Sequence, residues 1–275
     1  MTADNPTDPP NIGWYTSIEV DSKNRPHISY LEYTNYDLRY AYLDKGEWVR
    51  QVVDSAGSVG WYSSLELDSH DRPHIAYLDS TNSTLKYASF DGNSWTIESV
   101  DSGGASGGAS LTLDSNDRPH ISYQEHKSAY LKHAYYNGTS WIKETVDSSA
   151  SIGDFTSIDL DSSNRPAIAY YDDTNDVLKY AKFDGSKWNI ETDKSGESAW
   201  FPSLELDTND RPHISYYEPT GQNLKYIYFD GSAWQKDTVD TQGDVGWYTS
   251  LELDNDNNPH LSYLDNTNFY LKYAT

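Results

Sequence analysis

The chain has 275 residues and carries 43 Asp and Glu against 20 Lys and Arg, a formal net charge of −23 at pH 7. This excess of acid argues against nucleic acid as a partner, because phosphates need a basic surface, and it disfavours anionic membrane surfaces. The absence of cysteine excludes disulfides, thiolate metal sites and cysteine nucleophiles. The sequence contains no run of about 18 apolar residues, so it does not predict a membrane-spanning helix.

Residues 1–12 are polar and rich in proline, which predicts an N-terminal tail or a closing strand and does not fit a signal peptide. A chain cut just after an export signal would begin in this way, so we expect a secreted or cell-surface protein. Residues 13–275 are expected to form a single domain, because one motif recurs along their whole length.

The recurring motif is Arg-Pro-His-Ile-Ser-Tyr or a close variant of it, and it occurs six times. Its prolines are separated by 47, 46, 47, 46 and 47 residues. They are Pro26, Pro73, Pro119, Pro166, Pro212 and Pro259. A fixed period of this size indicates one supersecondary unit copied along the chain.

The second copy predicts four short strands, A to D, at residues 64–68, 74–79, 85–90 and 95–100. Strands A and B alternate large with small or polar side chains, the period of two that a pleated strand requires. Pro73 begins strand B, a position that suits a residue without a backbone donor. Asp91 and Gly92 between strands C and D are typical of a tight hairpin.

Four strands in a repeat of about 46 residues are typical of a β-propeller blade. The sequence therefore predicts an all-β, six-bladed β-propeller of four-stranded antiparallel blades. An open solenoid fits the period as well, but it would need polar capping repeats at both ends. The chain stops after strand C of the sixth copy, so that blade is expected to be three-stranded or closed by residues 1–7, where Pro6 disfavours a strand.

The C–D turn of the second copy, Ser-Phe-Asp-Gly-Asn-Ser-Trp at residues 89–95, resembles the Asp-box hairpin of sialidase-like propellers. Related turns occur at residues 184–188 and 230–234, although Gly follows Asp directly where the family places one residue between them. Asp boxes are structural turns, so this resemblance implies a fold. The sialidase catalytic set, an arginine triad with a Tyr/Glu pair and an Asp, has no match, because most arginines lie in the A–B turns.

The loops from strand D to the next strand A end in aromatic residues in most copies. These residues are Trp14, Tyr15, Trp61, Tyr62, Phe155, Trp200, Phe201, Trp247 and Tyr248. In known propellers strand A is innermost, so the rings are expected to form a collar at the channel mouth, interrupted in the third copy by Gly107 and Gly108. Aromatic faces stack on sugar rings, and Tyr and Trp add polar tips. Packing between blades is the alternative role.

Strand B ends in an acidic residue in every copy. Those predicted to assist ligand binding are Glu32, Asp79, Asp172, Glu218 and Asp265. Together with acids of strand A, they could hold Ca²⁺ through oxygen ligands. The alternative is structural, with hydrogen bonds in the B–C turn and ion pairs to the cations of strand C.

The third copy departs most from the others. It gathers Glu125, His126 and Lys127 after strand B, and His133 stands where other copies have Tyr. A carboxylate, imidazoles and an ammonium group could perform general acid–base chemistry on a glycan. Unselected variation of a loop is the alternative.

These patterns predict a non-catalytic, lectin-like module that binds a carbohydrate or another small polar ligand through its aromatic D–A loops. One alternative is a polysaccharide lyase or glycoside hydrolase with its site in the third copy, and another is a protein-interaction scaffold. We expect a monomer without a cofactor, Ca²⁺ being the one candidate.

Overall fold

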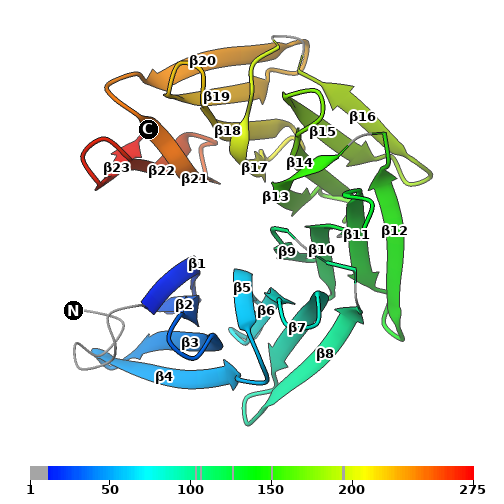
Figure 1. Cartoon of the computed structure of the whole chain (residues 1–275), viewed down its shortest axis with the longest axis vertical. Helices are drawn as coiled ribbons and strands as arrows, with labels where there is room; N and C mark the ends of the chain where they lie inside the picture. The colour runs from blue at the N-terminus through cyan, green and yellow to red at the C-terminus, as the bar shows by residue number, and fades with distance from the viewer. Residues whose placement is uncertain (1–11, 103, 106, 126, 150, 194–195) are drawn as a thin grey trace. The chain divides into compact units, whose positions relative to one another are not determined.

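The computed structural model describes residues 12–102, 104–105, 107–125, 127–149, 151–193 and 196–275, with the backbone alone for 12 and 152–154. The regular secondary structure in these residues consists of β-strands, and the strands form six antiparallel sheets (Figure 1). Five sheets have four strands each, and the last has three. The protein is therefore a six-bladed β-propeller, as predicted.

The strands follow the blades in chain order. Blade 1 holds β1 (Ile12–Val20), β2 (Pro26–Glu32), β3 (Asp37–Asp44) and β4 (Glu47–Asp54). Blade 2 holds β5 (Val59–Leu67), β6 (Pro73–Asp79), β7 (Thr84–Phe90) and β8 (Trp95–Asp101). Blade 3 holds β9 (Ser110–Leu113), β10 (Pro119–Gln124), β11 (Leu131–Tyr136) and β12 (Trp141–Asp147). Blade 4 holds β13 (Ile152–Leu160), β14 (Pro166–Asp172), β15 (Val177–Phe183) and β16 (Trp188–Thr192). Blade 5 holds β17 (Trp200–Leu206), β18 (Pro212–Glu218), β19 (Asn223–Phe229) and β20 (Trp234–Asp240). Blade 6 holds β21 (Val245–Leu253), β22 (Pro259–Asp265) and β23 (Tyr270–Ala274), and the closing strand predicted in residues 1–7 lies outside the described residues.

The chain divides into two compact units, residues 1–128 with 132–144 and residues 129–131 with 145–275. Blades 1 and 2 and most of blade 3 belong to the first unit, and blades 4 to 6 belong to the second. In each unit the core lies between facing blades, where strand B buries a tyrosine completely, as at Tyr77 and Tyr216. Burial of one such ring contributes about 2–3 kcal/mol. We name each interface by the two blades that it joins.

The repeated Arg-Pro stretch forms the A–B turn. In blade 1 the buried Asp21 accepts hydrogen bonds from the backbone of Lys23 and Arg25 at 2.9 and 2.8 Å and from Arg25 Nε at 2.6 Å. Asn24 takes the left-handed conformation (φ 58°) that this tight turn requires. Burial by itself would raise the pKa of Asp21, but the hydrogen bonds from Arg25 and Lys23 lower it to about 2. The turn therefore explains the repeated arginine without a ligand.

The histidine after each repeated proline pairs with a tyrosine of strand C. His27 Nδ1 is hydrogen-bonded to the hydroxyl of Tyr40, and His74 to that of Tyr87. The same pair recurs in blades 5 and 6. Such a pair satisfies two polar groups that would otherwise be buried at a cost of about 1–3 kcal/mol each.

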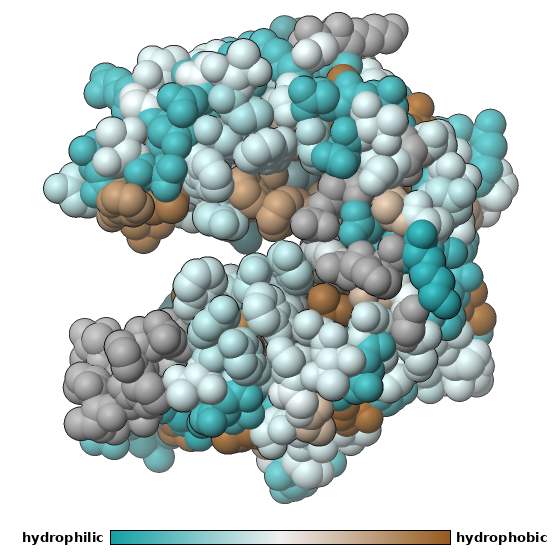
Figure 2. Space-filling view, in the orientation of Figure 1, coloured by the Kyte–Doolittle hydropathy of each residue, from teal (hydrophilic) through white to brown (hydrophobic). Residues whose placement is uncertain are grey.

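The C–D turn is a hairpin, as predicted. Asp91 Oδ1 accepts the amides of Asn93 and Ser94 at 2.7 and 2.8 Å, and Gly92 has a φ of 99°. Trp95 then packs edge-on against Tyr40 of blade 1, with ring centroids 5.3 Å apart. Most of the face in Figure 2 is teal or white, in agreement with the acidic composition.

Candidate functional site

The predicted aromatic pairs lie inside strand A, at a β-bulge. The register between β5 and β6 shifts between Trp61 and Ser64, and equivalent shifts occur in blades 1, 5 and 6. The expectation that these rings lie in D–A loops is therefore wrong, because β1, β5, β13, β17 and β21 already include them. The bulge inserts an extra residue into the strand and turns two successive side chains out of the regular alternation.

The second ring of each pair occupies an unusual backbone conformation. Tyr15, Tyr62, Phe201 and Tyr248 have φ angles of 51°, 53°, 54° and 51°. A bulky residue in the left-handed region is uncommon, and it costs about 1–3 kcal/mol that the surrounding structure must offset. The same conformation in four blades shows that the aromatic pair is built into the blade plan.

A glycine before the pair lets the strand approach the preceding blade. Gly60 has a φ of 90°, and a Cβ atom there would lie 2.9 Å from Leu38 Cα. Gly246 has a φ of 107° and the same distance to Leu224 Cα. Only glycine fits such a contact, so this residue sets the position of the rings that follow it.

The first unit holds a continuous group of rings, which we call the first aromatic cluster. It consists of Trp14, Tyr15, Tyr33, Tyr36, Trp61 and Tyr62. Trp14 stacks on Tyr33 with centroids 5.4 Å apart, and Tyr36 stacks on Trp61 at 6.1 Å. Tyr33 and Tyr36 lie in the B–C turn and were not predicted. A signal for them was present, since both follow the acid that ends strand B.

The second unit holds an equivalent group, the second aromatic cluster. It consists of Phe155, Trp200, Phe201, Tyr217, Trp247 and Tyr248. Phe201 lies 4.3 Å from Phe155 and 4.4 Å from Tyr248, centroid to centroid. Tyr217, which directly precedes the acid that ends strand B, was not predicted.

The two clusters carry polar groups at their edges. Trp61 Nε1 donates to Ser58 Oγ at 2.8 Å. Asp244 Oδ1 accepts from Trp247 Nε1 at 2.7 Å and from the hydroxyl of Tyr217 at 2.6 Å. Burial of Tyr217, with its bond to Asp244, raises the pKa of its hydroxyl to about 12, so this group stays a hydrogen-bond donor at neutral pH. Polar groups beside exposed rings are what an amphipathic ligand requires.

The third blade differs here, as the sequence suggested. Gly107 and Gly108 are both buried, and Ala109 packs against a core cluster between blades 2 and 3. Ala105 forms a bridge with Glu125. No aromatic pair stands at this position in the described part of blade 3.

The acids that end strand B are buried inside the B–C turns. Asp79 accepts the backbone and side-chain nitrogens of Asn82 at 3.1 and 2.9 Å and pairs with Lys86 at 3.0 Å. These hydrogen bonds in the B–C turn and this ion pair with a strand C lysine are the contacts expected if the acids have a structural role and do not bind a ligand. The equivalent acids with turn hydrogen bonds are Glu32, Asp172, Glu218 and Asp265. Glu32 directly precedes Tyr33 in the turn that also holds Tyr36, and Glu218 directly follows Tyr217 of β18, so these two acids help to position the three rings.

The four residues of the predicted acid–base set lie in different surroundings. Glu125 accepts a hydrogen bond from the backbone of Ser128, Lys127 is exposed, and His126 lies outside the described residues. His133 is buried, and its nitrogens contact His120 Nδ1 at 3.1 Å and Glu144 Oε1 at 2.9 Å. His120 is the second residue of β10, whereas Glu125 follows the end of this strand. The His133–His120 contact thus replaces the Tyr–His pair of the other blades.

Burial determines the charge of these two histidines. It lowers the pKa of His120 to about 3, and a positive charge on His133 would lower this pKa further. Burial also lowers the pKa of His133, although the bond to Glu144 opposes the change. Both rings are therefore neutral at pH 7.

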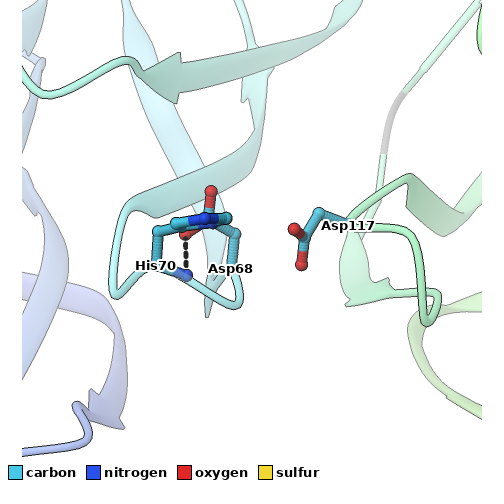
Figure 3. Close-up of side chains that lie close together, drawn as sticks. All are labelled: Asp68, His70 and Asp117. Atoms are coloured by element: carbon cyan, nitrogen blue, oxygen red, sulfur yellow. Dashed lines mark hydrogen bonds between the residues drawn. The ribbon is translucent and has the colours of Figure 1, made fainter.

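Asp68, His70 and Asp117 form a group close enough to share a metal ion (Figure 3). Asp68 already accepts the amides of His70 and Arg72, at 2.8 and 2.9 Å, and Arg72 Nε at 2.6 Å. Asp117 accepts both the amide and the hydroxyl of Ser69, at 2.9 and 2.7 Å. The same serine–aspartate link joins Ser22 to Asp71 and Ser162 to Asp210. The group is therefore an A–B turn with its link to the next blade.

No protein-family model and no curated protein matches the chain. Among solved structures it is similar to the Aleuria aurantia lectin, described as a six-bladed β-propeller that recognises fucose, with a TM-score of 0.62 and 12% identity over 96% of this chain and 95% of that one. It is also similar to the Hadza microbial sialidase Hz136 (TM-score 0.63, 11% identity, 92% and 63% of the two chains). A third similar structure is the GH93 α-L-arabinofuranosidase of Fusarium graminearum (TM-score 0.59, 13% identity, 94% and 90%). Similarity at such low identity shows the fold alone, and it agrees with the sialidase-like propeller suggested by the C–D turns. No helix among the described residues is long and apolar enough to cross a membrane.

Proposed function

We propose that this protein is a carbohydrate-binding module without catalytic activity and that it binds sugars on its two aromatic clusters. The observation that carries the proposal is the aromatic pair at the strand A bulge. Its second residue is held at positive φ in four blades. Backbone strain of this kind concentrates at functional sites.

Each cluster offers an exposed ring beside rings that are half-buried in the first cluster and partly or fully buried in the second. Trp14 is 52% exposed and stacks on Tyr33, and Tyr248 is 59% exposed and rests on Phe201, which is buried. An exposed ring on a rigid base can stack on the C–H face of a sugar with little loss of side-chain freedom. Beside the second cluster, the carboxylate of Asp244, which accepts from Trp247 and Tyr217, offers an acceptor for a sugar hydroxyl. The similarity to a lectin of known propeller fold supports this choice.

The test is binding on a glycan array, followed by calorimetry with the best ligand. We expect Trp61→Ala to weaken binding by the first cluster, and Trp247→Ala binding by the second, each by at least about tenfold. Trp188→Ala is the matched control, because Trp188 starts strand D and belongs to a core cluster away from both groups of rings. Thermal unfolding of each variant shows that it is folded. If a variant with both Trp61→Ala and Trp247→Ala bound the glycan with the same affinity as the parent protein, the proposal would be refuted.

The enzyme alternative makes a different prediction. A lyase or hydrolase would release new reducing ends from a polysaccharide and would lose this activity in Glu125→Gln. The described residues favour binding over catalysis, because His133 is buried and bonded to His120 rather than placed beside Glu125.

A further inference from the structure

Strand D of the fourth copy lacks one residue. In four other copies strand D begins with a Trp, and an Asp follows six residues later in the sequence. A valine directly precedes that Asp, as in Val53-Asp54 and Val100-Asp101. In the fourth copy only five positions separate Trp188 from Asp193, and no valine is present. The missing residue explains why Pro166 and Pro212 are 46 residues apart.

The missing residue is the one that fills the blade interface. In blade 1, Arg39 pairs with Val52 and Leu38 pairs with Asp54, so Val53 is the extra residue of a bulge, and it is buried. In blade 4, Lys179 pairs with Thr192, and the Asp193 amide donates directly to Leu178 O at 2.9 Å. Strand D of blade 4 therefore has no bulged residue to pack between the blades.

A second valine is also replaced at the same interface. Val59 is fully buried in the 1–2 interface, two residues before Trp61. At the 4–5 interface, Ser198 stands two residues before Trp200, and its hydroxyl bonds to Asp176. The 4–5 interface thus loses two apolar side chains that the 1–2 interface has. Ile227, where other blades have Ala, replaces part of their volume.

The result is a cavity of about 630 Å³ between blades 4 and 5. Its apolar wall includes Leu178, Ile214 and Trp234, and Ile190, 40% exposed, also lines it. A cavity of this volume matches the sites that hold small organic ligands. It lies within the second unit and contains no residue of the aromatic clusters.

One buried polar group at this cavity has no partner. The Tyr180 ring lines the cavity and is 6% exposed, and its hydroxyl makes no hydrogen bond to any described residue. The cause is in the sequence, since Ala167 replaces the histidine that bonds the equivalent tyrosine elsewhere. A buried hydroxyl without a partner costs about 1–3 kcal/mol, which a ligand with a hydrogen-bonding group can recover.

The charges at the cavity wall select the ligand further. Glu191 and Asp193 line it, and Lys236 is held by Asp193 at 3.1 Å and Glu197 at 2.6 Å. Because the ammonium group of Lys236 is already paired to two carboxylates, and Glu191 and Asp193 line the wall, the cavity disfavours anions. We propose that the 4–5 cavity binds a neutral, mainly apolar small molecule with one hydroxyl group, at a site separate from the sugar-binding clusters.

The test uses 2-naphthol, naphthalene and 2-naphthoate as probes, with binding measured by naphthyl fluorescence. We expect one 2-naphthol to bind per chain. Naphthalene should bind at least about tenfold more weakly, because it lacks the hydroxyl that forms the buried hydrogen bond. 2-Naphthoate should also bind at least about tenfold more weakly, because the acids at the cavity wall repel its carboxylate. Tyr180→Phe should reduce 2-naphthol to the affinity of naphthalene.

Two variants address the cavity itself. Ile190→Trp should abolish binding by filling the cavity from its exposed edge, whereas Ile97→Trp, the equivalent position of blade 2 and also 40% exposed, should not change it. Insertion of valine after Thr192 should abolish binding and raise the melting temperature.

The Trp61→Ala and Trp247→Ala variants should retain 2-naphthol, and Ile190→Trp should retain glycan binding, so the two proposals fail separately. Absence of 2-naphthol binding would show that the cavity is an empty packing defect. Binding that persists in both Ile190→Trp and the insertion variant would show that the probe binds elsewhere. Either result would overturn the inference.

Discussion

The 1–2 and 4–5 interfaces are built from the same strands, yet one is filled and the other is hollow. At the 1–2 interface Val53 and Val59 complete the core, and Tyr77 donates to Asp54 at 2.7 Å. At the 4–5 interface both valines are absent, and Asp193 is paired with Lys236 instead. The comparison teaches that a propeller repeat tolerates a one-residue loss in strand D without a change of blade plan. The cost is a cavity between blades 4 and 5.

Matched isoleucines in the two interfaces should give the largest difference. Ile75 and Ile214 occupy the same position of strand B and are 0% and 1% exposed. Ile75→Ala should lower the free energy of unfolding by about 4 kcal/mol and Ile214→Ala by about 2 kcal/mol, because Ile214 already faces empty space and loses fewer contacts. Urea denaturation measures both values. Equal costs would mean that the 4–5 interface is as tightly packed as the 1–2 interface.

Acidification should act on the interfaces that contain the histidine pairs. The buried His120 has a pKa near 3, against an ordinary value of 6.5, so the unfolded chain binds its proton first. The stability that the neutral His120 contributes is therefore fully present above about pH 6.5, and it is lost as the pH falls from there towards 3. The pKa values of His27, His74 and His213 are also lowered, primarily by burial, and add to this loss.

His133→Tyr restores the residue of the other blades and checks the pH effect. The variant should lose less stability between pH 6.5 and pH 4 than the parent, because it has one buried imidazole fewer to protonate. Denaturation midpoints across this range provide the measurement, and a loss identical to that of the parent would exclude His133 from the effect. Blade 4, with Ala167, offers no such pair.

Removal of one tyrosine hydroxyl should give a smaller difference. Tyr87→Phe removes the hydrogen bond of the tyrosine hydroxyl to His74 Nδ1 and should cost about 1 kcal/mol. Tyr180→Phe removes a hydroxyl that has no partner among the described residues, and it should be neutral or slightly stabilising. Thermal unfolding of both variants makes the comparison. A cost of 1 kcal/mol or more at Tyr180 would show that its hydroxyl is satisfied.

Chelation should have the smallest effect. The serine–aspartate links of the A–B turns are the same at the 1–2 and 4–5 interfaces, as Ser22 with Asp71 and Ser162 with Asp210 show. Since the carboxylates are already occupied by amides and hydroxyls, excess EDTA should leave the melting temperature unchanged. A clear decrease that added Ca²⁺ reverses would instead support the calcium site considered from the sequence.

Much of the fold could be predicted because its signals are local and repeated. Pro at the start of strand B and Asp-Gly between strands C and D each act within a few residues; the proline recurs in all six copies and Asp-Gly in three. The aromatic pairs were visible for the same reason. Tyr33, Tyr36 and Tyr217 were not identified, because their contacts with these pairs join residues far apart in the sequence.

The sequence by itself determined the number of blades, the order of strands and the turn chemistry of each copy. It also contained the missing valine, as a spacing of 46 residues in place of 47 between Pro166 and Pro212. Only the tertiary structure decided what this loss means. Pro73 and Pro119 are also 46 residues apart, and the 4–5 interface is where the shortening removes a buried residue of the bulge. The physical reason is that a deleted loop residue changes a path along the surface, whereas a deleted bulge residue removes volume from between two sheets.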